Sequence, residues 1–364
     1  MKTLFNTKAW LAMPLLISCF YACQKDMNTG KHPNEIGQLN LAGNNVKVDQ
    51  VNLVADTAGF GASRIDTNLK NAWGIAAAPG GPLWISANHT GLSVVYDKSG
   101  NMMRQPVTIP AAVAGQVGAP DGVIFNGTSE FGGNKFIFAS EDGIITGWKS
   151  GNTAVKVADR SSSNTVYKGI AMAFGGSSTS GCFLYLTDFH NGKIDVFDHN
   201  FNYVTDKPFK DPNIPAGFAP FNVVNIYGQL YVTYAKQKGP DNMDDQAGPG
   251  NGYVDIFTPD GMLVKRFASQ GTLNSPWGVT WAPAGFADSG PAILVSNFGD
   301  GRINIFDMHG NYKGQLQSGG QPVTIDGLWA IDFLKDHAGS GDPLYFTAGP
   351  DSESHGLFGY LRKK

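Results

Sequence analysis

The phrase "NAWGIAAAP" at Asn71–Pro79 returns much later in the chain as "SPWGVTWAP" at Ser275–Pro283. Four other segments align with it, and the shared small-residue position is held by Gly74, Gly122, Gly169, Asn222, Gly278 and Ala330. These positions recur at intervals of about fifty residues, a period that is typical of stacked or radial structural units. Each unit is expected to be unable to bury its own faces alone.

Every unit continues with two further apolar runs, such as "PLWISAN" at Pro82–Asn88 and "LSVVYD" at Leu92–Asp97 in the first unit. The runs are short, rich in Val, Ile, Phe and Tyr, and separated by turns that often contain Asn-Gly or Asp-Gly. This is the pattern of β-hairpins. The sequence shows no sustained helical periodicity after its first segment, so the pattern predicts an all-β fold.

The two ends of the repeat complement each other, because the last unit lacks a strand and an extra strand precedes the first unit. The second unit has a fourth strand at Ala154–Ser161, whereas the last unit stops at its third strand, "GLFGYLR" (Gly356–Arg362). A similar strand, Gln50–Thr57, stands before the first unit without a unit of its own. We therefore predict a six-bladed β-propeller in which this N-terminal strand closes the last blade and removes its open edge. A sandwich, barrel or parallel β-helix would not produce this repeat length.

The first segment lies outside the predicted propeller. It has Lys2 and Lys8, then an apolar run from Ala9 to Ala22, which is the layout of a secretory signal and is short for a membrane span. Both "LISC" (ending at Cys19) and "FYAC" (ending at Cys23) resemble a bacterial lipobox, in which the cysteine is lipidated. The polar residues after Cys23 favour that site, and an ordinary cleaved signal is the alternative.

This interpretation divides the chain into a lipoprotein-type signal peptide at 1–23, a flexible tether at 24–48 and a propeller domain at 49–364. It predicts an exported monomer held in the cell envelope by an N-terminal lipid, on the periplasmic side or as an outer-membrane lipoprotein. The chain has 364 residues and a formal net charge of −3, which gives no electrostatic reason to expect nucleic acid as a partner. We expect a protein or small-molecule ligand instead.

Two segments resemble NHL repeats: "LTDFHNGKIDVFDHNFNYV" at Leu186–Val204 and "VSNFGDGRINIFDMHGNYKG" at Val295–Gly314. From about Val51 to Leu361 the chain also resembles an uncharacterised family of exported bacterial propeller proteins, on motifs such as "GPGNGYVDIF" and "IDGLWAIDF". This resemblance implies the six-bladed fold and no established activity. More distantly, the architecture is similar to the gluconolactonase-like propellers, which are metal-dependent hydrolases.

The start of an innermost strand and the end of the second strand meet at one rim of a propeller's central channel. The first group supplies Asn71, Asp121, Lys168, Asn222 and Asp326; the second supplies Asn88, Glu141, Asp188 and Asn297, with His89, His190 and Asp300 in adjoining turns. We predict ligand contact at this mouth for Asn71, Asn88, Asp121, Glu141, Asp188, His190, Asn222, Asn297 and Asp326.

Clustered carboxylates suit Ca²⁺ or another hard divalent ion, and the metal hypothesis names Asp121, Glu141, Asp188 and Asp326 as ligands. The competing interpretation is structural, because Asn and Asp before Gly are common turn residues whose side chains cap the local backbone.

Two functions follow from these patterns. The first is a binding or interaction platform without catalysis, which the absence of a nucleophile elbow, a zinc-peptidase motif or a phosphate loop favours. The alternative is a divalent-metal-dependent hydrolase of the gluconolactonase type at the channel mouth. A long insertion, "YAKQKGPDNMDDQAGPGNGY" (Tyr234–Tyr253), is either a lid over this mouth or a solvated loop.

Overall fold

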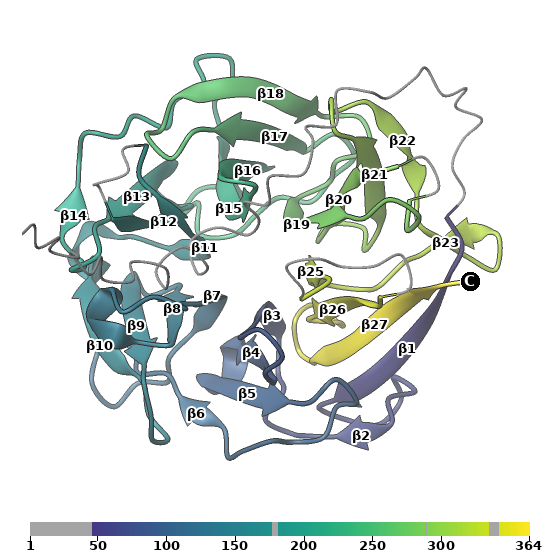
Figure 1. Cartoon of the computed structure of the whole chain (residues 1–364), viewed down its shortest axis with the longest axis horizontal. Coiled ribbons are helices and arrows are strands. Elements are labelled where there is room, and N and C mark those ends of the chain that lie inside the picture. The colour runs from purple at the N-terminus through teal and green to yellow at the C-terminus, as the bar shows by residue number, and fades with distance from the viewer. Residues whose placement is uncertain (1–45, 177–180, 288–289, 335–341) are drawn as a thin grey trace, which may run out of the picture.

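A computed structural model describes residues 46–176, 181–287, 290–334 and 342–364. Six small sheets stand around a central axis like the blades of a propeller, with antiparallel pairing except between the two outermost strands of one sheet (Figure 1). In this part of the chain no helix is long and apolar enough to cross a membrane. The predicted all-β, six-bladed architecture is confirmed. The proposed signal, Cys19, Cys23 and nearly all of the tether lie outside the described residues.

Each blade is a meander that starts at the axis and moves outward, as hairpin-rich sequences do. Blade 1 contains β3 (Ala72–Ala77), β4 (Leu83–Ala87), β5 (Leu92–Tyr96) and β6 (Val107–Thr108). Blade 2 contains β7 (Pro120–Phe125), β8 (Phe136–Ser140), β9 (Ile144–Trp148) and β10 (Val155–Asp159). Blade 3 contains β11 (Tyr167–Phe174), β12 (Cys182–Asp188), β13 (Lys193–Phe197) and β14 (Tyr203–Val204).

The second half of the ring repeats this order. Blade 4 contains β15 (Phe218–Ile226), β16 (Gln229–Lys236), β17 (Gly252–Phe257) and β18 (Leu263–Ser269). Blade 5 contains β19 (Pro276–Ala282), β20 (Ala292–Asn297), β21 (Ile303–Asp307) and β22 (Tyr312–Gln315). A small hairpin follows, formed by β23 (Gln317–Ser318) and β24 (Gln321–Pro322). Short 3₁₀ turns occur at η1 (Asn88–Thr90), η2 (Phe131–Gly133) and η3 (Ser161–Ser163).

Blade 6 joins the two ends of the described chain. It contains β25 (Leu328–Asp332), β26 (Leu344–Ala348) and β27 (Leu357–Lys363), followed by β1 (Val48–Ala55) and β2 (Arg64–Ile65). Strand β1 pairs antiparallel with β27 from Val48 opposite Lys363 to Ala55 opposite Leu357. The predicted closure by the N-terminal strand is therefore confirmed, and β1 covers an edge that would otherwise be open to aggregation.

The repeated small residue packs one inner strand against the next. A Cβ atom added to Gly74 would lie 2.5 Å from the carbonyl oxygen of Asp121 in the neighbouring blade, and one added to Gly278 would lie 2.7 Å from the carbonyl oxygen of Trp329. Backbones can approach this closely only where no side chain intervenes. This contact explains why the aligned phrase is the most regular feature of the repeat.

A second repeated position reinforces the ring. Near the end of the second strand, five of the six blades carry a buried hydroxyl residue at one repeated position, Ser86, Thr187, Thr233, Ser296 and Thr347, whereas blade 2 has Ala139 there. Thr187 donates to the carbonyl oxygen of Phe221 at 3.1 Å, and Ser296 donates to that of Trp329 at 2.8 Å, in each case in the following blade. Thr347 donates to the carbonyl oxygen of Trp73 and so connects blade 6 to blade 1. The ring is closed by these bonds as well as by apolar packing.

Candidate functional site

The residue before each repeated small position points toward the propeller axis. We call these the axial residues: Trp73, Asp121, Lys168, Phe221, Trp277 and Trp329. In all six inner strands the pairing with the second strand is interrupted at this residue by a bulge. Bulges re-aim side chains and are frequent beside functional sites.

Four of the axial residues are aromatic and close the channel. Trp73 and Trp329 stack with ring centroids 3.5 Å apart, and Trp277 meets both of them edge-on at 5.9 Å. Phe221 contacts Trp329 from blade 4. The Trp73–Trp277 and Phe221–Trp329 contacts join non-adjacent blades and therefore cross the axis, and we call the four rings the aromatic plug. All four are nearly inaccessible to solvent.

The other two axial residues are charged and come from neighbouring blades 2 and 3. The Lys168 ammonium forms an ion pair and a hydrogen bond with Glu141, lies 3.7 Å from Asp244 Oδ1, and sits 5.0 Å from the ring centroid of Trp73. Its side chain is only 3% exposed. A buried ammonium is tolerated here because carboxylates and an aromatic face surround it.

Asp121 is fully buried beside this ion pair. The side-chain amide of Asn88 in blade 1 donates to Asp121 Oδ1 at 2.7 Å and to Glu141 Oε2 at 3.1 Å. Among the described residues, Asp121 Oδ2 has no hydrogen-bond partner, although it is inaccessible to solvent. An unpaired oxygen of this kind is uncommon in a protein interior and calls for an explanation.

Glu353 completes the cluster from blade 6. Asn71 Nδ2 donates to Glu353 Oε2 at 2.6 Å, and Asn71 Oδ1 accepts from Trp329 Nε1 at 3.0 Å. His89 Nε2 lies 3.4 Å from the same Asn71 amide nitrogen. Three consecutive residues, Asp351–Glu353, have positive φ angles of 55°, 52° and 66°. Left-handed conformations are unfavourable for non-glycine residues, and such strain is concentrated at functional sites.

The environment sets the protonation of these groups in different ways. Burial, followed by the charge of Glu141, raises the pKa of Asp121 well above its usual value. Burial also raises the pKa of Glu353, to about 7. For Glu141, burial is outweighed by the Lys168 charge and hydrogen bond, so its pKa is lowered. For Lys168, burial is outweighed by Glu141 and Asp121, so its pKa is raised. Perturbed acids gathered at one location are a feature of functional sites.

We define the polar mouth as Asn71, Asn88, Asp121, Glu141, Lys168 and Glu353. Part of the predicted insertion lies against it: Asp244, whose side chain is 70% exposed, reaches Lys168. The carbonyl oxygen of Asp241 accepts from His190 Nδ1 at 2.8 Å, and the Gly248 backbone N–H donates to Asn274 Oδ1 at 2.7 Å. The segment is therefore tied to blade 3 and to the entry of blade 5, beside the polar mouth.

Two of the predicted residues hold a turn in blade 3. Asp188 is buried and accepts from Asn191 Nδ2 at 2.8 Å and from Thr165 Oγ1 at 3.2 Å. Neither partner belongs to the polar mouth, so Asp188 acts as the turn-capping residue of the alternative interpretation. The His190 ring donates to the carbonyl oxygen of Asp241 in the insertion and not to a residue of the polar mouth.

Three more predicted residues also lie apart from the cluster. Asn222 takes the place of a ring glycine, so its side chain points to the next blade and donates to the carbonyl oxygen of Trp277 at 2.9 Å. Asn297 donates to the carbonyl oxygen of Thr272 at 2.8 Å and to Asp300 Oδ1 at 3.0 Å. Asp326 is exposed and accepts from the Asp351 backbone N–H at 2.7 Å. In each case the side chain is hydrogen-bonded to a nearby backbone group.

The four carboxylates of the metal hypothesis are therefore not brought together. Asp121 and Glu141 are neighbours, whereas Asp188 and Asp326 bind other groups, and the Lys168 ammonium supplies the positive charge beside Asp121 and Glu141. Within the described ranges, no three His, Cys, Asp or Glu residues are placed to hold one metal ion. The residues present suit an ammonium counter-charge better than a divalent ion.

Glu353 was not predicted to belong to the site. It lies between the second and third strands of blade 6, in "AGPDSESHG" (Ala348–Gly356), where blades 1, 2, 3 and 5 have shorter turns such as "SEDG" (Ser140–Gly143). The extra length and the acidic content of this connection were the available signal. Its strained backbone could not be anticipated from composition.

Comparison with known proteins shows the family to which the chain belongs. The chain is 36% identical over 316 residues to the uncharacterized protein R648 of Acanthamoeba polyphaga mimivirus, across 83% of this chain and 77% of that protein. It is 34% identical over 332 residues to the uncharacterized protein L690 of the same virus, across 86% of each. The chain belongs to the family of these mimivirus proteins. These relatives are viral, so the bacterial origin that the resemblance implied is not supported.

No family model matches the chain. Among solved structures, the propeller is similar to a streptogramin B lyase, with a TM-score of 0.52 and 14% identity, across 87% of this chain and 97% of the lyase. It is also similar to a protein of unknown function from Bacteroides thetaiotaomicron, with a TM-score of 0.53 and 12% identity, across 88% of this chain and 75% of that one. At these identities the likeness supports the fold alone.

Proposed function

We propose that the protein is a ligand-binding propeller of the cell envelope, exported and lipid-anchored, which holds a small polar ligand at the polar mouth. The observation that carries this proposal is the cluster of Lys168, Glu141 and Asp121, in which Lys168 and Asp121 are buried and Asp121 Oδ2 has no hydrogen-bond partner among the described residues. A ligand hydroxyl, which can both donate and accept a hydrogen bond, would satisfy this oxygen in either protonation state of the carboxyl.

Stability does not explain such a group. Two charges removed from water rarely repay their desolvation, and apolar residues of the same size often stabilise a core better. The strained turn at Asp351–Glu353 adds a cost of about 1 kcal/mol or more for each left-handed residue. A site that keeps both features is better understood as prepared for a ligand than as a device for folding.

The same electrostatics favour binding over catalysis. Lys168 is held as an ammonium, so its nitrogen has no lone pair with which to attack a substrate. Glu141 is held as a carboxylate and is already paired with Lys168. The metal-dependent hydrolase hypothesis needs carboxylates from several blades around one ion, and the described residues supply no such group.

The ligand can be sought with a thermal-shift screen of the purified mature protein against amino acids, monosaccharides and hydroxy acids. A ligand that binds the folded state raises the apparent melting temperature by mass action. We expect hits to lose at least about tenfold in affinity in Asp121→Asn, which is about 1.4 kcal/mol.

The matched control is Asp188→Asn, a second buried aspartate placed away from the polar mouth, which should bind as the wild type does. Hits that weaken equally in both variants, or a screen in which no compound distinguishes wild type from Asp121→Asn, would refute a ligand site at the polar mouth.

The anchor is a separate part of the proposal and rests on the lipobox-like sequences before Cys19 and Cys23. Labelling of cells with radioactive palmitate, with the protein expressed as wild type, Cys23→Ala and Cys19→Ala, tests it. We expect label in the wild type and in Cys19→Ala and its loss in Cys23→Ala. Unlabelled wild-type protein would contradict lipidation.

A further inference from the structure

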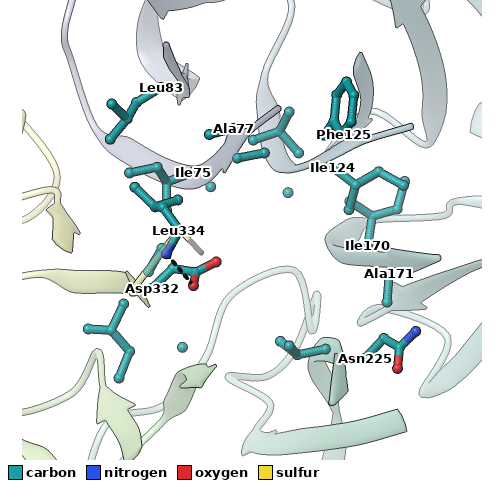
Figure 2. A pocket seen from close by; sticks show the side chains of 18 of the residues that line it. Ile75, Ala77, Leu83, Ile124, Phe125, Ile170, Ala171, Asn225, Asp332 and Leu334 are labelled. Atoms are coloured by element: carbon teal, nitrogen blue, oxygen red, sulfur yellow. Dashed lines mark hydrogen bonds between the residues drawn. The ribbon is translucent and has the colours of Figure 1, made fainter. Parts of the chain in front are cut away.

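The end of the channel opposite the polar mouth contains a cavity of about 480 Å³ (Figure 2). All six inner strands contribute to it, with the residues that follow the repeated small position. Its walls are largely aliphatic, as Ile75, Ile124, Ile170 and Leu334 illustrate in Figure 2. Close-packed protein interiors contain few such spaces, so a preformed cavity of this size needs an explanation.

The cavity is chemically distinct from the polar mouth. Trp277 of the aromatic plug lies at its inner end, which places the plug between the two sites. The charged side chains in its lining are Lys98 and Asp332, one of each sign. Asn225 lies in the wall, but its amide already donates to the carbonyl oxygen of Met172 at 2.9 Å. The walls therefore select for apolar surface and the cavity carries no net charge.

We propose that this cavity is a second binding site, which takes an uncharged and mostly apolar small molecule. The volume lies in the range of about 300–1,000 Å³ that small-molecule sites occupy. Six strands enclose the space around its whole circumference, so a helix or an extended peptide has no open side along which to lie. Burial of apolar ligand surface supplies the binding energy, less the costs of association.

The test uses N-phenyl-1-naphthylamine, a neutral apolar dye whose fluorescence rises when it leaves water. Wild-type protein should bind the dye saturably at one site. Ala77→Trp places a large ring in the cavity and should weaken binding at least tenfold. Ala114→Trp introduces the same ring at an exposed alanine and should bind the dye as the wild type does.

Two further variants make the result decisive. Ile124→Asn replaces an apolar side chain of the cavity wall with an amide and should also weaken dye binding. It keeps the test valid if Ala77→Trp does not melt cooperatively. Asp121→Asn at the polar mouth should leave dye binding unchanged, which separates this site from the proposed function. Binding that is absent in wild type, unchanged in Ile124→Asn, or lost equally in Ala114→Trp would overturn the proposal.

Discussion

Lys168 and Glu141 form an ion pair that joins blade 3 to blade 2 at the propeller axis, next to the face of Trp73. The lysine side chain is almost fully buried, while the glutamate is 28% exposed. Each charge is stable in this position chiefly because the other is present. The pair therefore couples the integrity of the polar mouth to the packing of three blades.

Removal of the ammonium should be costly. In Lys168→Met, Glu141 loses its counter-charge, and we expect the free energy of unfolding to fall by about 3–5 kcal/mol. The double variant Lys168→Met/Glu141→Gln should recover part of this loss, because it leaves no uncompensated carboxylate at position 141. Urea titration of the variants measures both values.

The matched control is the exposed pair of Lys156 and Asp159, whose side chains are each 38% exposed. There, Lys156→Met should change the free energy of unfolding by less than about 1 kcal/mol. Equal losses in Lys156→Met and Lys168→Met would contradict the role assigned to the buried pair.

Glu353 predicts a pH dependence. Its pKa is raised to about 7 in the folded protein, against a usual value of 4.5. Between these values the unfolded chain loses a proton that the folded chain keeps, so stability falls as pH rises through this window. Glu353→Gln keeps the oxygen that Asn71 donates to and removes the titration.

The stability difference between Glu353→Gln and wild type should therefore be small near about pH 4.5 and grow to about 3 kcal/mol by about pH 8. Other acids, such as Asp255, titrate in both proteins and cancel in the difference. Urea unfolding across this pH range measures it, and a difference that does not change with pH would show that Glu353 is not a perturbed acid.

The repeat made the fold predictable from sequence, because each inner strand must accept its neighbour's backbone at one small residue. The same alignment located Asp121 and Lys168 at the axis. It failed at Asn222, whose place in the internal repeat is right but whose side chain donates to the carbonyl oxygen of Trp277 in the next blade. A bulge beside each axial residue decides this direction, and a bulge has no reliable signature in a single sequence.

The remaining errors share a physical cause. Asp188 and Asp326 lie at the expected rim of their blades, but their carboxylates accept hydrogen bonds from neighbouring backbone N–H groups or turn side chains. Glu353 reaches the site only through a left-handed turn that its residue types do not favour. Local hydrogen-bond competition and backbone strain are properties of three-dimensional surroundings, so spacing along the chain could not reveal them.

Metal addition and removal should have little effect on the folded protein. The Lys168 ammonium already neutralises the carboxylate of Glu141, so a divalent ion would have to compete with it. We expect the melting temperature to change by less than about 2 °C on addition of Ca²⁺, Mn²⁺ or EDTA, since an ion that binds the folded state would raise it. A saturable rise with Ca²⁺, reversed by EDTA, would restore the metal hypothesis.

The ring of hydroxyl groups offers a comparison within one molecule. Ser296 accepts from the Gly278 backbone N–H at 3.0 Å and donates to the carbonyl oxygen of Trp329, so Ser296→Ala leaves two buried backbone groups unpaired. We expect a loss of about 1–3 kcal/mol in the free energy of unfolding. Ser86 holds the equivalent position in blade 1, but its hydroxyl has no hydrogen-bond partner among the described residues.

Ser86→Ala is therefore the matched control, with the same substitution, the same burial and no bond to lose, and it should lie within about 0.5 kcal/mol of wild type. Chemical denaturation of both variants gives the comparison, and hydrogen exchange of the β25 amides should increase in Ser296→Ala alone, because blade 6 loses its bond to blade 5. Equal destabilisation by the two substitutions would mean that the hydroxyls fill space and that apolar packing alone closes the ring.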